Sequence, residues 1–474
     1  MTSHVGPATT AAEYPEQGGE AAVLHDRAAA EAYVASVCFK HGPPMLTGVE
    51  LEWLVRPRPS EKLTAARLAA ALGRHCPVAL DPSSPADPLP GGSLVTVEPG
   101  GQIELASPPL PDLAGLVTTT AADADALHRL AAAAGLAVED RAADPDRPPQ
   151  RVLELPRYRA MEQSFDRIGP HGRSAMCSTA AVQICVDAGE RGAVAARWAA
   201  VHALGPVLLA AFANSPRLHG RRTGWKSTRW AVWMRADPAR TAPPDDPEPA
   251  DPAAAWARRV LDAPVLCVRR NGGWLVPEGL TFADWVGGRE PRPPTVADLD
   301  YHVSTLFPPV RPRGHLEVRY VDMQPGRRWA LPTAVLTALL SDPGVIDFVR
   351  NACAPARARW VSAARHGLAD RVLAQAAVQV FELACARLPD LGAPTWLTDE
   401  LVVMTERLVR HGLCPADEPE GASLLPCPKR PRPKRRPPRR CAPASPSCSP
   451  LRGPAARRSP TPSTTPTSSR STRR

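Results

Sequence analysis

Apolar and polar positions alternate along four stretches of the chain, which is the pattern of β-strands that bury one face. In residues 48–55 the odd-numbered positions are apolar, and the carboxylates of Glu50 and Glu52 share the opposite face. The other three stretches cover residues 94–105, 176–187 and 314–322, and a Pro-Gly-Gly bend interrupts the first of these at residues 99–101. Their polar faces carry, in chain order, Glu98, Gln102 and Glu104; Cys177, Thr179, Gln183 and Asp187; and His315, Glu317 and Arg319.

Helix-forming composition surrounds these strands. Helices are predicted at about residues 20–38 and 121–134, from about residue 190 onward, and through residues 331–412. The longest apolar stretch, residues 193–213, is interrupted by Arg197, His202 and Gly205-Pro206, so it predicts a pair of buried helices and not a membrane span. Proline-rich loops at residues 144–150 and 241–252 separate these blocks. The mixture of strands and helices predicts an α+β protein.

The polar faces of the four strands are unusual because most of their charged residues are glutamates. A bland interpretation is that these are surface strands with solvated faces, but such strands favour Thr, Lys, Arg and Ser outward. Two carboxylates ~4 Å apart repel by about 4 kcal/mol at an effective dielectric of roughly 20, so gathering several of them calls for cations. Oxygen ligands without a His/Cys cluster suit Mg²⁺, which usually shares its coordination with substrate phosphates. The pattern therefore indicates a nucleoside triphosphate site on a sheet.

The net charge of +9 is confined to one end of the chain. Residues 421–474 hold 14 of the 57 Lys and Arg residues and no Asp or Glu, which leaves 43 basic and 48 acidic residues in the remainder. Composition thus divides the chain into a flexible N-terminus (1–20), one catalytic domain (21–414) and a disordered basic tail rich in Pro, Arg and Ser (415–474). Nucleic acid would bind only nonspecifically, through the run at residues 428–440.

Several other classes of site are disfavoured by the sequence. The 11 cysteines include no CxxC pair, which argues against a zinc finger and for reduced thiols in the cytoplasm. Glu13 and Glu16 in the N-terminal segment, which lacks an apolar core, argue against a signal peptide. Residues 220–227 (GRRTGWKS) resemble a phosphate-binding loop, but Trp225 stands between the second glycine and the lysine.

Six blocks in order resemble the plant and proteobacterial type of glutamate–cysteine ligase, and most of all the form that opens ergothioneine biosynthesis in high-GC bacteria. The blocks are residues 48–52 (GVELE), 97–105 (VEPGGQIEL), Arg157-Tyr158 with Met161, 176–187 (MCSTAAVQICVD), 212–216 (FANSP) followed by Ser227, Arg229 and Trp233, and 305–322 (TLFPPVRPRGHLEVRYVD). The similarity runs from about residue 48 to 322 and more weakly to about 415. Cys185 departs from it, because many relatives carry Asn there.

The resemblance implies a glutamine synthetase-like fold, in which helices pack behind a curved antiparallel sheet. It also implies an enzyme that uses ATP and Mg²⁺ to join the γ-carboxylate of L-glutamate to the amine of L-cysteine through γ-glutamyl phosphate. The implied metal ligands are Glu50, Glu52, Glu98, Glu104 and Glu317, and the implied catalytic pair is Glu317 and Arg319. The implied substrate contacts are Arg157, Tyr158, Thr179, Gln183, Arg229 and Trp233, and the implied ATP contacts are Gln102, Arg313 and Arg319.

Two alternatives to this function stay open. A ligase of the same family could use another acceptor amine, and a protein of a different class could bind nucleic acid through the basic tail. Cys177 and Cys185 invite a covalent mechanism, but a buried inert thiol is the favoured interpretation of both.

Overall fold

A seven-stranded sheet, antiparallel in every pairing, forms the centre of the protein in a computed structural model that describes residues 22–270 and 273–419. The strand order is β2-β3-β1-β5-β9-β8, and β4 pairs with the far end of β1. The strands are β1 (Thr47–Pro57), β2 (Leu94–Val97), β3 (Ile103–Ala106), β4 (Leu136–Glu139), β5 (Ala181–Val186), β8 (Val310–Pro312) and β9 (Leu316–Asp322). A separate hairpin joins β6 (Arg217–Leu218) to β7 (Arg221–Arg222).

All four predicted strand regions contribute to this sheet, with two corrections. Residues 94–105 are a hairpin, β2–β3, and not one bent strand, because the chain reverses at residues 99–101, where Gly101 adopts φ +85°. The third strand begins at Ala181, five residues later than predicted, because His171–Cys177 folds as helix α5. Strands β4 and β8 are too short to give an alternation that the sequence could reveal.

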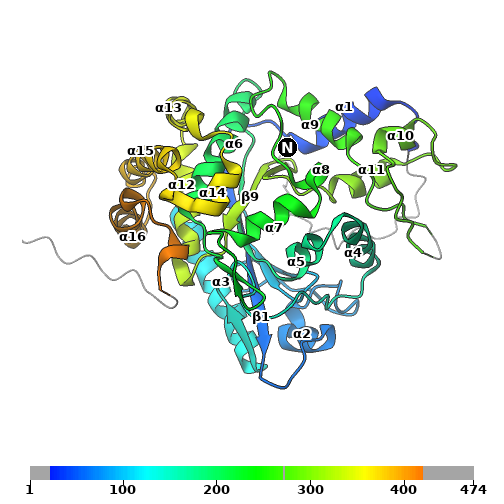
Figure 1. The fold of residues 1–474 in the computed structure, drawn as a ribbon, viewed down its shortest axis with the longest axis horizontal. Helices are drawn as coiled ribbons and strands as arrows, with labels where there is room; N and C mark the ends of the chain where they lie inside the picture. The colour runs from blue at the N-terminus through cyan, green and yellow to red at the C-terminus, as the bar shows by residue number, and fades with distance from the viewer. Residues whose placement is uncertain (1–21, 271–272, 420–474) are drawn as a thin grey trace, which may run out of the picture. The chain divides into compact units, whose positions relative to one another are not determined.

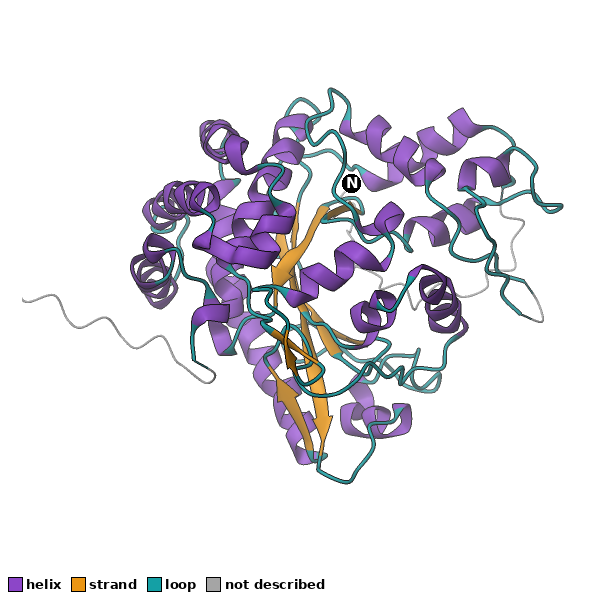
Figure 2. Ribbon diagram, viewed as in Figure 1, coloured by secondary structure: helices purple, strands orange, loops and turns teal. Residues whose placement is uncertain are grey.

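Helices cover both faces of the sheet. Figures 1 and 2 show α3, α6, α12 and α15 on one side, and α4, α5 and α7 on the other. The prediction of helices behind an antiparallel sheet is confirmed, and the second set adds a wall in front of it. The helices are α1 (Arg27–Cys38), α2 (Ala65–Leu72), α3 (Leu113–Ala133), α4 (Pro156–Ile168), α5 (His171–Cys177), α6 (Val194–Ala211), α7 (Thr228–Ala236), α8 (Pro238–Thr241), α9 (Pro252–Asp262), α10 (Phe282–Val286), α11 (Val296–Val303), α12 (Ala330–Leu339), α13 (Pro343–Cys353), α14 (Trp360–His366), α15 (Arg371–Arg387) and α16 (Thr395–Arg407).

The core lies between the apolar face of the sheet and the first set of helices. Leu51, Ile184 and Val318 are fully buried there, as the alternation predicts. Helix α6 crosses behind the sheet and accepts a hydrogen bond at Val201 O from Tyr320 Oη of β9, at 3.0 Å. Since this apolar face is buried, the register of the strands commits the alternate residues to the opposite face.

Helix α6 is one continuous helix, so the predicted pair of helices is wrong. Pro206 lies inside the helix, where it removes one backbone hydrogen bond without ending the helix, because packing holds it on all sides. The helix is long and apolar enough to cross a membrane, but 89% of it is buried inside the protein. Its composition is that of a core helix.

The described residues extend slightly beyond the predicted start of the basic tail at residue 415. Pro415–Asp417 forms a 3₁₀ turn, Asp417 pairs with Lys226, and Glu418 accepts a hydrogen bond from Arg328 Nη1 at 2.8 Å. Residues 1–20, predicted to be flexible, and residues 420–474 of the predicted tail lie outside the described residues.

Substitution of Gly205 by alanine tests the packing of α6. A Cβ at this position would lie 2.1 Å from Cη2 of the buried Trp360 ring, so Gly205→Ala is expected to lower the free energy of unfolding by about 1–3 kcal/mol. Urea unfolding followed by circular dichroism measures the change. Gly192→Ala is the control, because nothing lies within 4 Å of a Cβ there. Equal stability of the two variants would contradict the packing described.

Candidate active site

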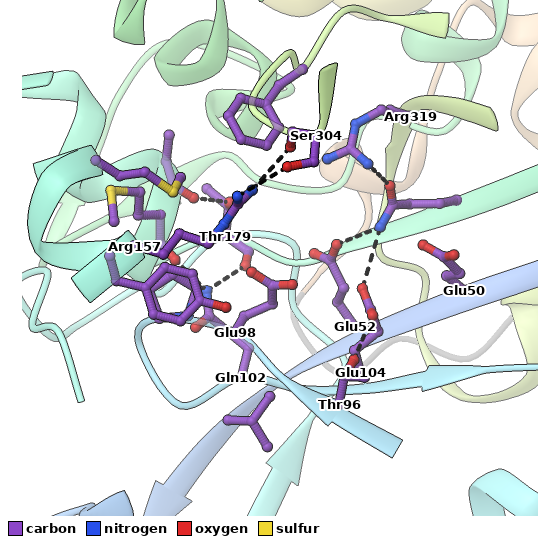
Figure 3. A pocket seen from close by; sticks show the side chains of 18 of the residues that line it. Glu50, Glu52, Thr96, Glu98, Gln102, Glu104, Arg157, Thr179, Ser304 and Arg319 are labelled. Atoms are coloured by element: carbon purple, nitrogen blue, oxygen red, sulfur yellow. Dashed lines mark hydrogen bonds between the residues drawn. The ribbon is translucent and has the colours of Figure 1, made fainter. Parts of the chain in front are cut away.

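The polar face of the sheet and the front helices enclose a solvent-open cavity with about 1050 Å³ between its walls. Strands β1, β2, β3, β5, β8 and β9 form one side, and α4, α5 and α7 contribute to the other. The lining residues include Glu50, Glu52, Thr96, Glu98, Gln102, Glu104, Arg157, Tyr158, Met161, Met176, Thr179, Gln183, Trp233, Ser304, Phe307, Arg311, Arg313 and Arg319. Figure 3 shows many of these side chains converging from separate segments.

The register of the strands and the turn after β2 gather four carboxylates into an acidic wall, defined as Glu50, Glu52, Glu98 and Glu104. Glu52 lies directly across from Glu104 on β3, and Glu104 lies across from Thr96 on β2. Thr96 Oγ1 donates a hydrogen bond of 2.5 Å to Glu104 Oε1 (Figure 3). The predicted convergence of these four glutamates on one cavity is therefore observed.

Burial leaves the acidic wall electrostatically unfavourable in the absence of a cation. Burial, followed by the charge of Glu317, raises the pKa of Glu50 to about 7, and burial together with Glu98 raises that of Glu52 to about 7. Burial also raises the pKa of Glu98, and burial with Glu50, Glu98 and Glu52 nearby raises that of Glu104 well above its usual value. In each case the first cause is the removal of the carboxylate from water, which disfavours its charged form.

An arginine cluster, defined as Arg311, Arg313 and Arg319, lines the same cavity from β8, the turn after it and β9. Arg311 donates to both oxygens of Glu317, from Nε at 2.7 Å and from Nη2 at 2.8 Å, and Arg319 also pairs with this carboxylate. Although burial opposes ionisation, these guanidinium groups hold the pKa of Glu317 well below its usual range. The cavity thus places anionic and cationic surfaces together, which suits phosphates that are bound with a cation.

Comparison with known proteins identifies the family that shares this arrangement. The profile of glutamate–cysteine ligase family 2 matches residues 46–420, which include every lining residue named above. The chain belongs to glutamate–cysteine ligase family 2.

Individual relatives agree with this family membership. A glutamate–cysteine ligase EgtA of Mycobacterium tuberculosis is 39% identical over 421 residues, covering 83% of this chain and 90% of that protein. The EgtA of Mycolicibacterium smegmatis is 44% identical over 336 residues, covering 70% and 78%. Among solved structures, a glutamate–cysteine ligase of Francisella tularensis in complex with AMP aligns with a TM-score of 0.47 at 13% identity, covering 80% of this chain and 84% of that one. That likeness is too distant to assign roles to residues, so the glutamine synthetase-like description still rests on the family resemblance.

Two residues that the family resemblance singled out lie outside the cavity wall. Glu317, predicted to bind metal and to take part in catalysis, is fully buried beneath the arginine cluster. Arg229, predicted to bind substrate, is only 3% exposed, and its Nη2 donates to the backbone carbonyl of Arg319 at 2.8 Å. Its Nε and Nη1 have no hydrogen-bond partner in the described part of the ligase chain.

A buried carboxylate fixes Arg229 and the start of α7. Asp322 accepts hydrogen bonds from Ser215 Oγ at 2.7 Å and from Ser227 Oγ at 2.8 Å. Ser227 is also the N-cap of α7, whose second residue is Arg229. One buried side chain at the end of β9 therefore connects that strand to the front helix.

The predicted substrate contacts on the side of the cavity to which α4, α5 and α7 contribute do line it, but most have hydrogen-bond partners within the protein. Arg157 donates to Ser304 Oγ at 3.1 Å and to Ser304 O at 2.9 Å, and Trp233 Nε1 donates to Thr179 Oγ1 at 3.2 Å. Tyr158 lines the cavity beside them, and burial raises its pKa. These contacts hold the wall in place before a substrate arrives.

Gln102, predicted to contact ATP, also has partners within the protein. Its Nε2 donates to the carbonyls of Met176 and Thr179 at 3.1 and 2.9 Å, which joins the β2–β3 turn to the region after α5. Gln102 lines the cavity, and its Oε1 is buried without a partner among the described residues.

Arg311 is the main residue that the sequence interpretation missed. It pairs with Glu317 because the β8–β9 hairpin turns at Gly314 (φ +80°), which places residues three before and three after the glycine opposite each other. The Arg-Pro-Arg-Gly-His turn in the sequence was the signal that could have revealed this pair. Thr96, Met161, Met176, Ser304 and Phe307 also line the cavity without having been proposed as site residues.

The five glutamates predicted to bind metal were assigned to Mg²⁺ without a fixed number of ions, and that role stays a prediction. Across residues 22–270 and 273–419, no three His, Cys, Asp or Glu side chains are arranged to hold one metal ion. Glu317 is paired with Arg311 and Arg319. Glu50 and Glu98 accept no side-chain hydrogen bond within the described chain, so their oxygens are the least committed.

Cys177 and Cys185 have the environment of unreactive thiols. Burial raises the pKa of Cys177 to about 12, and burial together with Glu50 raises that of Cys185 well above its usual value. Because the thiolate is the nucleophile, both side chains are poorly suited to covalent catalysis near neutral pH.

Replacement of Arg311 tests the ion pair beneath the cavity. Arg311→Met removes a bidentate partner of a fully buried carboxylate, so the free energy of unfolding is expected to fall by about 3 kcal/mol. Arg371→Met, at an exposed position that starts α15, is the control and is expected to change stability by less than about 0.5 kcal/mol. Urea midpoints of the ligand-free proteins give both values. A loss no larger than that of the control would mean that Arg319 alone satisfies Glu317.

Proposed function

We propose that this protein is an ATP-dependent glutamate–cysteine ligase, which joins the γ-carboxylate of L-glutamate to the amino group of L-cysteine and yields γ-glutamylcysteine. The observation that carries the proposal is that an acidic wall and an arginine cluster lie side by side in one cavity, within the segment that matches the family. The names of the mycobacterial relatives, which cover most of the chain, support the same activity.

The reaction requires activation of a carboxylate. An oxygen of the glutamate γ-carboxylate attacks the γ-phosphorus of ATP, the bond to the β–γ bridging oxygen breaks, and ADP leaves. The cysteine nitrogen then attacks the acyl carbon of γ-glutamyl phosphate, inorganic phosphate leaves, and the amine loses a proton. Both steps bring anions together, so stabilisation of negative charge is the main demand on the protein.

Arg319 and Arg313 supply positive charge at the transferred phosphate in this proposal. Their guanidinium groups line the cavity and can each grip two phosphate oxygens. Glu317 is assigned the role of holding Arg311 and Arg319 in place, in contrast to the metal-ligand role that the sequence suggested. Arg157, Tyr158, Thr179 and Trp233 form the opposite side, where an amino acid would be oriented.

Mg²⁺ is proposed to be held by the acidic wall. The donor chemistry suits this ion, because four carboxylates line one cavity, two of them buried and two half-buried, although no three of them meet at one point in the described residues. When bound, the ion neutralises phosphate charge. Glu50 and Glu98 are the first candidates because they are uncommitted, and Glu52 and Glu104 complete the set.

The wider setting is also a proposal. The resemblance to the form of the family that opens ergothioneine biosynthesis supports a role in that pathway, in the cytoplasm, where thiols stay reduced. No membrane is involved in this proposal, and nucleic acid binding is limited to nonspecific contacts of the basic tail.

Phosphate release tests the reaction and its acceptor. Purified protein with ATP and Mg²⁺ is expected to release phosphate rapidly only when glutamate and cysteine are both present. A panel of other amines at the same concentration separates a cysteine ligase from a relative that uses another acceptor.

Glu50→Gln is expected to reduce kcat by at least about 100-fold, because it removes charge from the acidic wall. No cysteine-dependent release by the wild-type protein would overturn the proposal.

Removal of residues 421–474 tests the contribution of the basic tail. The cavity is built from residues 50 to 319, so the truncated protein is expected to keep kcat and every KM within about twofold of the full chain. Steady-state kinetics at low and moderate salt make the comparison. Loss of turnover by a truncated protein that unfolds with the same midpoint would assign the tail a role in catalysis.

A further inference from the structure

The side chain of Gln183 lies between the acidic wall and the arginine cluster. It projects from β5, which lies between β1 with Glu50 and Glu52 and β9 with Arg319. The pairing of β5 with β9 shifts register between Val182 and Ile184, so Gln183 sits at the irregularity. It is 2% exposed and lines the cavity.

Both ends of this amide are hydrogen-bonded. Nε2 donates to Glu52 Oε1 at 2.8 Å and lies 3.5 Å from Glu104 Oε2, and Oε1 accepts from Arg319 Nη1. A carboxylate only accepts and a guanidinium only donates, so one orientation of the amide satisfies all three partners. If the amide were flipped, its oxygen would face the carboxylate oxygens of Glu52 and Glu104, and its nitrogen would face the guanidinium group of Arg319.

Gln183 is the one side chain in the described ranges that bonds to both the acidic wall and the arginine cluster. On the acidic side the bonds continue from Glu104 to Thr96, and on the basic side from Arg319 to Glu317 and Arg311. The sequence predicted that Gln183 would bind substrate. These contacts occupy its amide with protein partners instead.

We propose that Gln183 is a positioning residue that acts as a neutral spacer between Arg319 and the carboxylates of Glu52 and Glu104. Opposite charges attract strongly in a buried, low-dielectric site, so without a spacer Arg319 is free to form a direct ion pair with the acidic wall. Such a pair would withdraw the guanidinium from phosphate and the carboxylate oxygens from a cation. The amide satisfies both groups by hydrogen bonds and leaves their charges available.

This inference rests on the proposed ligase reaction, because the charges are kept apart for phosphoryl transfer. It predicts that the spacer affects turnover more than the binding of the acceptor amino acid. Positioning errors of about 1 Å are enough to cost ~100-fold in rate.

Two replacements at this position separate the contributions of the amide. Gln183→Met keeps the approximate volume and removes both sets of hydrogen bonds. Gln183→Glu keeps an acceptor for Arg319, but creates a direct ion pair and adds a negative charge beside Glu52 and Glu104. Gln375→Glu, at an exposed position on α15, is the control for the added charge.

Steady-state kinetics with each substrate varied in turn give the first readout. Both Gln183 variants are expected to lower kcat by at least about tenfold and to change the KM for cysteine by less than about threefold. Gln375→Glu is expected to match the wild-type protein. A Gln183→Met protein with unchanged thermal midpoint and kcat within about twofold of wild type would overturn the inference. So would an increase of about tenfold or more in the KM for cysteine, which would mark a substrate contact.

A double-mutant cycle on the ligand-free protein gives a readout that does not depend on activity. Gln183→Glu and Glu52→Gln exchange the amide and the carboxylate, so the double variant can restore a donor–acceptor pair between β5 and β1. Its Tm is expected to exceed that of Gln183→Glu. If the loss of Tm in the double variant equals the sum of the losses in the two single variants, the spacer contact is overturned, even if the single variants fold poorly.

The two readouts distinguish failure of the inference from failure of the proposed function. If the wild-type protein shows no cysteine-dependent phosphate release, the ligase assignment fails, and the spacer contact is still decided by the Tm cycle. If the wild-type protein is active and Gln183→Met is equally active, only the spacer role fails.

Discussion

The gathering of four carboxylates, partly removed from water, on one cavity is the constraint on which this active-site structure depends. Strand register fixes Glu50, Glu52 and Glu104 on one face of the sheet, the turn after β2 adds Glu98, and burial raises the pKa of each. The protein does not cancel this charge completely with its own arginines. Arg311 and Arg319 are engaged with Glu317, and the amide of Gln183 lies between Arg319 and Glu52. In the proposed function, this arrangement leaves carboxylates for a cation and guanidinium groups for phosphate.

The remainder of the fold holds these charges in place. The continuous helix α6 and its neighbours bury the apolar face of the sheet, which fixes which residues point into the cavity. Asp322 connects β9 to the start of α7, so hydrogen bonds join the strand that carries Arg319 to the helix that carries Trp233. The same buried polar groups thus contribute to the stability of the fold and to the proposed chemistry. Burial of the apolar core behind them offsets the free energy that it costs to bury these groups.

The periodicity of the sequence predicted the faces of the strands well, because side-chain alternation is a local property. Glu50, Glu52, Glu98 and Glu104 all reach the cavity as the pattern required. The α+β class and the antiparallel sheet follow from the same signal together with the family resemblance.

The sequence could not show how deeply a side chain is buried or which side chain it pairs with. Arg229 and Glu317 carry the right charges, but only the packed structure shows that both lie behind the cavity wall. Arg311 escaped notice because its partner is set by the geometry of a hairpin. Pro206 suggested a break in α6, and tertiary packing overrode that local preference.

The long strand β1 restricts how the length of this protein can vary in evolution. It pairs with β3, β4 and β5 at once, so a single inserted or deleted residue between Thr47 and Pro57 would exchange its two faces. Leu51 and Trp53 would then enter the cavity, and the glutamates would enter the apolar core. Gains and losses of residues among natural relatives are therefore expected in the connecting loops, such as the segment between β1 and α2, and not within this strand.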